Sequence, residues 1–348
     1  MCGIVGYVGD RNILSVLIVG LERLSYRGYD SAGVAIVSDD EISVWKKPGK
    51  VHVLAKELES KSIDGNAGVG HTRWATHGIP NEVNSHPHFD AKRRFSVVHN
   101  GIIENYLQLK SELVKEGFLF RSQTDSETIV HLIDKYYNGS LIEAVQKAVS
   151  RLEGSFAICV VSAFDANCMV VARKNSPLII GVGKNENYVS SDVNALIHHT
   201  KRVIYLEDNT IAKVCQGEIR LIDFDGASKD YAIEDVHWTA EKSEKNGFDY
   251  FMQKEIYEQP QVVRNILDTY IKGDDIVFPK LGFKEDDLKN MSRFIIQACG
   301  TSWHSGLIGK YLIEDIARVP TEVDISSEFR YRRMLNSSNE IVVAISQS

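Results

Sequence analysis

The sequence has few of the features that mark secreted, metal-binding or nucleic-acid-binding proteins. Its 348 residues include only five cysteines, an odd number without CxxC spacing, so neither a disulfide framework nor a zinc site is expected. No basic run stands out in a chain whose formal net charge is -7. Binding to nucleic acid or to an anionic membrane surface is therefore not expected as the main task.

Features that direct a chain to a membrane or through one are also missing. The first residues lack a basic segment followed by an apolar stretch and a cleavage site. No uninterrupted apolar run is long enough to span a bilayer. We therefore expect a cytoplasmic protein whose thiols stay reduced. The composition, 43% hydrophobic and 25% charged with few prolines, is that of a globular protein with a full core, and the length favours two domains.

Hydrophobic patterning in the first two thirds of the chain predicts an α+β domain. Short β-prone runs are separated by turn residues, and several stretches between them have helical periodicity. Grouped strands with helix pairs between the groups predict antiparallel sheets covered by helices. The predicted strands are 3–9, 32–37, 42–46, 67–74, 95–103, 156–163, 169–173, 178–182, 203–206 and 211–222, and the predicted helices are 13–24, 106–116, 126–137 and 141–152.

The pattern changes near residue 239, where a polar stretch without periodicity indicates a linker. A long helix interrupted near Pro260 is predicted next, followed by a β-α-β pattern that predicts a parallel α/β sheet. The predicted helices are 252–271 and 305–318, and the strands are 294–298, 321–325 and 341–345. We therefore expect domains at 1–238 and 249–348, joined by a linker at 239–248.

Cys2 directly follows Met1 and precedes a predicted strand. Removal of Met1 would leave Cys2 with a free α-amine whose pKa of about 7.7–8 suits a general base. The thiol ordinarily titrates at about 8.5, so proton transfer from thiol to amine is nearly balanced. One residue could then supply both nucleophile and base. A cysteine at position 2 can also occur by chance, so this hypothesis depends on other segments.

Two polar segments could bind an amino acid. Arg73 follows a predicted strand and could hold an α-carboxylate through a two-pronged charge-assisted pair, with Thr76 and His77 adding hydrogen bonds. The alternative is that these side chains lie on a solvated edge. Asp125 could accept the α-ammonium group of the same ligand, although Asp125 or Ser126 could instead cap the next helix.

Asn100 and Gly101 form a third segment. The Asn100 side-chain N–H and the Gly101 backbone N–H are the two donors that a tetrahedral oxyanion needs, and removing one such donor costs about 3–4 kcal/mol. The alternative is an Asn-Gly hairpin turn. Apolar residues continue through Ile102 and Ile103 without a matching return strand, which argues against the turn.

Together, the segments 1–7, 26–33, 73–74 and 99–101 resemble class II glutamine amidotransferases, and more narrowly the isomerising glutamine–fructose-6-phosphate aminotransferases. The resemblance implies an N-terminal-nucleophile hydrolase fold, an αββα sandwich. It also implies roles for individual residues. Cys2 would be the nucleophile, and the oxyanion hole would be formed by Asn100 and Gly101. Glutamine would be held by Arg73, Thr76, His77 and Asp125. Trp74 would gate an ammonia channel, and the site would be lined or supported by Arg27 and Tyr29.

The C-terminal region resembles the beginning of a sugar-isomerase domain, in the segments 250–256 and 298–302. Thr301 and Ser302 follow a buried strand and precede a helix, where hydroxyl and N–H groups can bind phosphate. Ser346, Gln347 and Ser348 follow the next strand and offer further donors. The alternative for either cluster is a helix cap.

The sequence departs from this family where it stops, at Ser348, inside a motif expected to continue. We therefore expect a fragment with an incomplete α/β parallel-sheet sugar-isomerase domain and an unpaired sheet edge. Such a chain would hydrolyse glutamine to glutamate and ammonia without a cofactor or metal. The resemblance implies that the complete enzyme is a homodimer that passes ammonia to fructose 6-phosphate and makes glucosamine 6-phosphate.

Two other functions are compatible with parts of the sequence. An N-terminal cysteine amide hydrolase without an acceptor would share Cys2, but the linker and the sugar-isomerase segments argue against it. A non-catalytic sugar-phosphate-binding regulator would share the C-terminal region. Retention of Cys2, Asn100 and Asp125 together argues against that second alternative.

Overall fold

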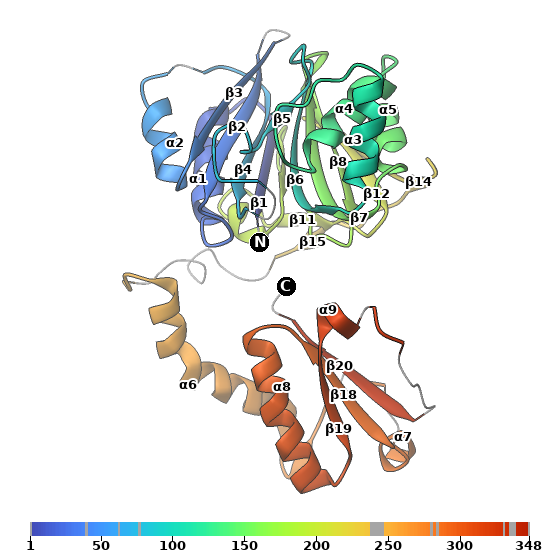
Figure 1. Ribbon diagram of the computed structural model, residues 1–348. Helices are drawn as coiled ribbons and strands as arrows, with labels where there is room; N and C mark the ends of the chain where they lie inside the picture. Colours follow the sequence, from blue (N-terminus) through green and yellow to red (C-terminus); the bar gives the residue numbers. More distant parts are fainter. Residues whose placement is uncertain are drawn as a thin grey trace. The chain divides into compact units, whose positions relative to one another are not determined.

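A computed structural model of the chain describes residues 2–38, 41–61, 63–75, 78–236, 247–278, 281–282, 285–329, 331–333 and 339–346. The chain divides into two compact units, Met1–Gly247 and Phe248–Ser348 (Figure 1). Nearly all of the predicted linker lies outside the described residues, so the domain boundaries given above stay predictions.

The first unit contains two antiparallel sheets. The eight-stranded sheet has the order β15-β11-β9-β10-β1-β4-β2-β3, and the seven-stranded sheet has the order β14-β13-β12-β8-β7-β6-β5. The strands of the first sheet are β1 Gly3–Val8, β2 Ser31–Ser38, β3 Glu41–Pro48, β4 Ala67–Arg73, β9 Ile179–Val182, β10 Asn187–Ser190, β11 Arg202–Tyr205 and β15 Glu234–Asp235. Those of the second are β5 His88–Phe89, β6 Phe95–Ile103, β7 Gly154–Ser162, β8 Asp165–Lys174, β12 Thr210–Cys215, β13 Ile219–Asp223 and β14 Ser228–Lys229.

Helices cover the outer face of each sheet (Figure 1). The helices α1 Ile13–Arg23 and α2 Val51–Leu58 lie on the first sheet, whereas α3 Tyr106–Lys115, α4 Glu127–Tyr136 and α5 Leu141–Val149 lie on the second; a short 3-10 helix spans Val193–Ala195. Helix α1 begins where the Asn12 side chain accepts a hydrogen bond from the Ser15 N–H, a standard N-cap.

Strand alternation sends successive side chains of β1 into different layers of the core. Ile4 and Val8 pack between the two sheets, while Val5 and Tyr7 pack against the helical layer of α1 and α2. A third apolar layer joins the second sheet to α3, α4 and α5. The predicted αββα sandwich is therefore confirmed.

Some predicted elements in this unit were wrong. The single strand expected over 211–222 is two strands, β12 and β13, because a turn at Gly217 separates them. Strand β10 and helix α2 were not predicted. The expectation that all thiols stay reduced also needs correction: Cys168 and Cys215 form a disulfide, because the antiparallel register of β8 and β12 places them directly opposite each other.

The second unit contains a three-stranded parallel sheet with the order β19-β18-β20. Helix α6 runs through Pro260, so the predicted interruption is absent from its assigned span. The elements are α6 Phe251–Tyr270, β16 Ile271–Lys272, β17 Asp275–Ile276, α7 Glu285–Lys289, β18 Arg293–Ala298, α8 Thr301–Leu312, a π-helical turn Ile313–Ala317, β19 Thr321–Ile325, α9 Ser326–Phe329 and β20 Glu340–Ile345. Within the described part of the chain, no helix is both long and apolar enough to cross a membrane.

Candidate active site

The first unit holds a cavity of about 320 Å³ at the beginning of β1. Gly3 of β1 pairs with Thr72 of β4, so the antiparallel register brings Cys2 beside Arg73 and Trp74. Strand β6 of the other sheet and the segment before α4 complete the walls. The lining residues are Cys2, Arg27, Arg73, Trp74, His86, His99, Asn100, Gly101, Ile102, Thr124, Asp125, Ser126, Ser176 and Pro177.

The Cys2 thiol is held by the backbone of Trp74. The Trp74 N–H donates to Cys2 Sγ at 3.2 Å, and Sγ lies 3.5 Å from the Trp74 carbonyl oxygen. Burial raises the pKa of Cys2, while the Trp74 N–H and the Arg73 charge lower it by smaller amounts. In this structure the pKa of the partly buried Cys2 thiol therefore lies above its ordinary value. A thiol of raised pKa requires a base to become a nucleophile.

Asn100 lies within β6, and its side-chain amide connects the nucleophile to the other sheet. Its Nδ2 donates to the Cys2 carbonyl oxygen at 3.0 Å, and its Oδ1 lies 3.0 Å from His71 Nε2. Gly101 has φ +125°, and a Cβ atom there would lie 2.0 Å from the Ser155 carbonyl oxygen, so only glycine fits. Both residues belong to a continuous strand, which excludes the alternative of an Asn-Gly hairpin turn.

Arg73 and Asp125 supply opposite charges to the same cavity. Arg73 is only 4% exposed, and its Nη2 donates to the Gly78 carbonyl oxygen at 3.5 Å. Burial lowers the pKa of the Arg73 guanidinium, and Asp125 is among the anions that raise it. The Asp125 carboxylate accepts the Ile103 N–H at 2.8 Å. Thr76 and His77, which were predicted to join them, lie outside the described residues.

The other predicted residues of this pocket line the cavity or pack beside a residue that does. Arg27 lines the cavity while pairing with Asp192 at 2.8 Å. Trp74 is 45% exposed at the mouth. Tyr29 does not line the cavity, and its ring instead packs edge-on against Trp74 at 5.4 Å between centroids. The structure therefore brings together Cys2, Arg27, Arg73, Trp74, Asn100, Gly101 and Asp125.

Sequence reasoning missed a group of four buried side chains, two of which, His86 and His99, line the cavity. The group, called here the histidine cluster, consists of His71, His86, His88 and His99. The His71 and His86 rings stack at 4.2 Å, and His86 and His88 meet at 4.6 Å. Burial is the largest cause that lowers the pKa of every member, to about 3 for His71. The cluster is therefore uncharged at neutral pH. The signal in the sequence was the position of these histidines beside the three polar segments.

The sugar-isomerase residues lie in the second unit. Ala298 of β18 pairs with Ile345 of β20 in parallel, so Thr301, Ser302 and Ser346 all follow strand ends at one edge of the sheet. Gln347 and Ser348 lie outside the described residues. Among the described residues, there is no group of three or more His, Cys, Asp or Glu side chains that could hold a metal ion.

An αββα sandwich whose central strand begins beside a cysteine that lines a cavity defines an N-terminal-nucleophile type of architecture. The chain belongs to the glutamine amidotransferase domain family, whose model matches residues 57–246. The SIS domain model matches residues 287–348.

Curated relatives match the whole chain. It is 48% identical over 348 residues to a glutamine–fructose-6-phosphate aminotransferase [isomerizing] of Aquifex aeolicus, covering 100% of this chain and 58% of that protein. It is 44% identical over 349 residues to the protein of the same name from Caldanaerobacter subterraneus subsp. tengcongensis, and the match covers 100% of this chain and 57% of that protein. The chain thus spans a little over half the length of the curated relatives it matches.

Solved structures support the fold alone. The glutamine phosphoribosylpyrophosphate amidotransferase of B. subtilis, complexed with ADP and GMP, has a TM-score of 0.59 at 19% identity and covers 92% of this chain and 65% of that one. A structure described as the allosteric regulatory enzyme of purine biosynthesis also has a TM-score of 0.59 at 19% identity, and the match covers 97% of this chain and 68% of that one.

Proposed function

We propose that this chain hydrolyses the side-chain amide of glutamine with Cys2 as nucleophile. The observation that carries the proposal is the arrangement around Cys2, whose thiol meets the Trp74 N–H and whose backbone meets the Asn100 amide. Asn100 and Gly101 would stabilise the oxyanion. Arg73 and Asp125, with Thr76 and His77, would hold the α-carboxylate and α-ammonium groups of glutamine.

The reaction would proceed through a thioester. With Met1 removed, the α-amine of Cys2 takes the thiol proton as Sγ attacks the amide carbon, and the tetrahedral intermediate collapses when that proton passes to the departing nitrogen. Ammonia leaves and a γ-glutamyl thioester remains. Water then cleaves the thioester, which yields glutamate and restores the thiol. The raised pKa of Cys2 makes this base necessary.

We further propose that the longer protein to which this chain corresponds transfers the ammonia to fructose 6-phosphate to form glucosamine 6-phosphate. The names of the curated relatives and the SIS match support this acceptor. Trp74 would gate the ammonia path, Arg27 and Tyr29 would support the glutamine pocket, and the sugar phosphate would bind at Thr301, Ser302, Ser346, Gln347 and Ser348. The domains would be 1–238 and 249–348, in a cytoplasmic homodimer.

The nucleophile is tested by glutaminase assays on Cys2→Ala, with Cys299→Ala as a control that removes an exposed free thiol of the second unit. We expect Cys2→Ala to abolish glutamate release and Cys299→Ala to leave it unchanged. Mass spectrometry of the purified protein should show a chain that begins at Cys2. Wild-type activity in Cys2→Ala, or full activity with Met1 retained, would refute the mechanism.

The acceptor is tested separately with a chain extended past Ser348. Incubation with glutamine and fructose 6-phosphate should yield glucosamine 6-phosphate, detected by chromatography against the standard. Glutamate release without any amino sugar would contradict the proposed acceptor and leave the glutaminase assignment intact.

A further inference from the structure

A second cavity in the first unit shares no lining residue with the first. Its volume is about 270 Å³, and its walls include Lys46, Glu82, His88, Phe89, Arg121 and Glu127. Lys46 comes from β3 of one sheet and Phe89 from β5 of the other. Arg121 lies in the segment that leads into α4, and Glu127 is the first residue of that helix.

Three cations surround the Phe89 ring. Lys46 Nζ lies 5.6 Å, Arg93 Cζ 5.1 Å and Arg121 Cζ 5.5 Å from the ring centroid. Each is close enough for a cation–π contact, yet three like charges around one ring repel one another. Among the residues that the structure describes, none of the three forms an ion pair with a carboxylate, whereas the neighbouring Lys47 pairs with Glu57 at 2.9 Å.

The Lys46 ammonium can still donate a hydrogen bond in the cavity that it lines. It donates to the carbonyl oxygens of Ser85 at 2.9 Å and Val83 at 3.4 Å, which occupies two of its three N–H groups. Burial lowers the pKa of Lys46 to about 8, and the nearby charges of Glu127 and Glu82 oppose that effect. A bound anion would stabilise the charged ammonium.

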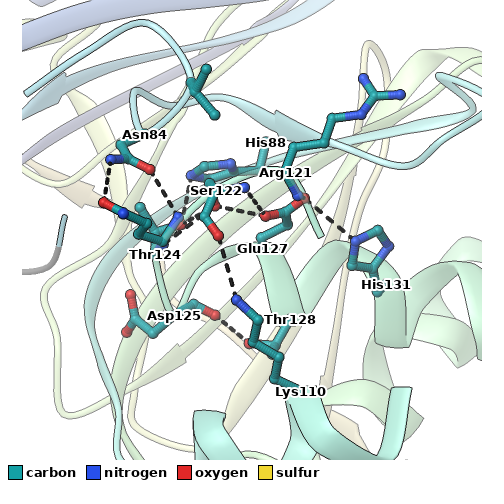
Figure 2. Close-up of polar contacts among 12 residues, drawn as sticks. Asn84, His88, Lys110, Arg121, Ser122, Thr124, Asp125, Glu127, Thr128 and His131 are labelled. Atoms are coloured by element: carbon teal, nitrogen blue, oxygen red, sulfur yellow. Dashed lines mark hydrogen bonds and ion pairs between the residues drawn. The ribbon is translucent and has the colours of Figure 1, made fainter. Parts of the chain in front are cut away.

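The buried carboxylate in the cavity wall is already satisfied by its own chain segment. Glu127 accepts the N–H groups of Arg121 at 2.8 Å and Ser122 at 2.6 Å, together with the Ser122 hydroxyl at 2.7 Å. Figure 2 shows the Arg121 side chain extending away from this carboxylate. The guanidinium of Arg121 is therefore available to a ligand, and Glu82 is the other carboxylate in the wall.

We propose that this second cavity binds a small metabolite through a phosphate group held by Lys46 and Arg121, with Arg93 adding its charge beside the Phe89 ring. A phosphate dianion offsets clustered cations better than a single carboxylate, and a guanidinium fork matches its oxygens. The apolar Phe89 face suits the uncharged part of the metabolite. This site is distinct from the phosphate loop proposed in the second unit.

The second cavity is connected to the glutamine pocket through hydrogen bonds. His88 lines the second cavity, and its Nε2 lies 3.0 Å from Thr124 Oγ1, which belongs to the wall of the first (Figure 2). Gln123, next in the same segment, donates its N–H to Asn84 Oδ1 at 2.9 Å. A ligand that orders Arg121 would therefore act on the segment that carries Asp125.

The test is isothermal titration of the full chain, first with inorganic phosphate and then with glucose 6-phosphate, at constant ionic strength. We expect Arg121→Gln, which alters an exposed side chain, and Lys46→Met each to weaken binding about tenfold, which corresponds to about 1.4 kcal/mol. Lys47→Met, one residue along β3, should change this affinity less than twofold, whereas any binding that is lost in Ser302→Ala belongs to the site proposed in the second unit.

Three outcomes would overturn the proposal. These are no saturable binding by the wild-type chain, binding that falls in Ser302→Ala but not in Arg121→Gln, and a sugar phosphate that binds no more tightly than inorganic phosphate. If Lys46→Met fails to fold, Arg121→Gln together with Arg93→Asn decides the result. Asparagine accepts the left-handed backbone of Arg93, whose φ is 54°.

Discussion

Replacement of His71 by alanine should slow glutamine hydrolysis although His71 does not line the active-site cavity. His71 Nε2 lies 3.0 Å from two oxygens, Asn100 Oδ1 and the His99 carbonyl, so it must carry a proton. Its pKa of about 3 makes the ring neutral, and Nδ1 has no hydrogen-bond partner among the described residues. His71 is therefore a positioning residue that fixes the Asn100 amide with Nδ2 toward Cys2.

The size of the effect follows from what Asn100 loses. Without His71, the Asn100 amide can flip and present its oxygen where the proposed oxyanion forms. Complete loss of such a donor costs about 3–4 kcal/mol, or 100- to 1,000-fold in kcat. A residue that only orients the donor should cost less, and we expect a fall of about 10- to 30-fold, or about 1.4–2 kcal/mol. The KM for glutamine should change little because the interaction forms in the transition state.

The assay is steady-state glutamate release by His71→Ala and His71→Gln, both checked for folding by thermal melting. Glutamine can place an amide N–H near the position of His71 Nε2, so His71→Gln should recover most of the lost rate. A merely structural role would not distinguish the two variants in kcat. A folded His71→Ala within twofold of wild type, or a His71→Gln as slow as His71→Ala, would refute the positioning role.

Three other expectations concern stability and binding. Members of the histidine cluster have folded-state pKa values below the unfolded value, so the stability they contribute is present above about pH 6.5 and is lost on acidification. For His71, whose folded-state pKa is about 3, the loss at pH 5.5 is about 1.4 kcal/mol, and urea melts that coincide at pH 7.5 and 5.5 would contradict this. Gly101→Ala should lose at least about 3 kcal/mol of unfolding free energy, while Gly217→Ala, with no atom within 4 Å of its added Cβ, should lose less than about 1 kcal/mol. Equal urea midpoints for the two would count against the clash. Arg73→Lys should raise the KM for glutamine about tenfold, because it removes a bidentate contact to the glutamine carboxylate. Arg94→Lys, which replaces an arginine that pairs with Asp90, should leave this KM unchanged. Similar KM values in the two variants would exclude the proposed role of Arg73.

Local patterns were sufficient to predict the strands that dominate the core. The predicted bounds of β6 and β19 coincide with those observed, because each strand begins and ends in a β-branched or apolar residue. The apolar residues of the run 211–222 nearly bridge the turn at Gly217, so the hydrophobic pattern predicts one strand where the structure has two. Helix α2 is short and only three of its side chains are buried, so its periodicity is weak.

Contacts between segments remote in sequence could not be derived from patterns. The disulfide depends on the register of β8 and β12, which no single strand specifies. The contact of His71 with Asn100 joins one sheet to the other, so it exists only after the sheets stack. Arg73 and Asp125, 52 residues apart, do line one cavity, and the binding of a zwitterion between them stays a prediction.

The position of β1 inside its sheet has a consequence for the order in which the protein is made. Strand β1 lies between β4 and β10, and the Ile4 N–H donates to Ser191 Oγ, 187 residues later. During translation, the strand that carries Cys2 leaves the ribosome long before its β10 neighbour is synthesised. Strand β1 therefore has only one of its two neighbours available at first, and its pairing with β10 can form only after residue 190 has been synthesised. Pairing of β1 with β4 can come first, so the part of the sheet formed by β1 to β4 should form before the part formed by β9 and β10.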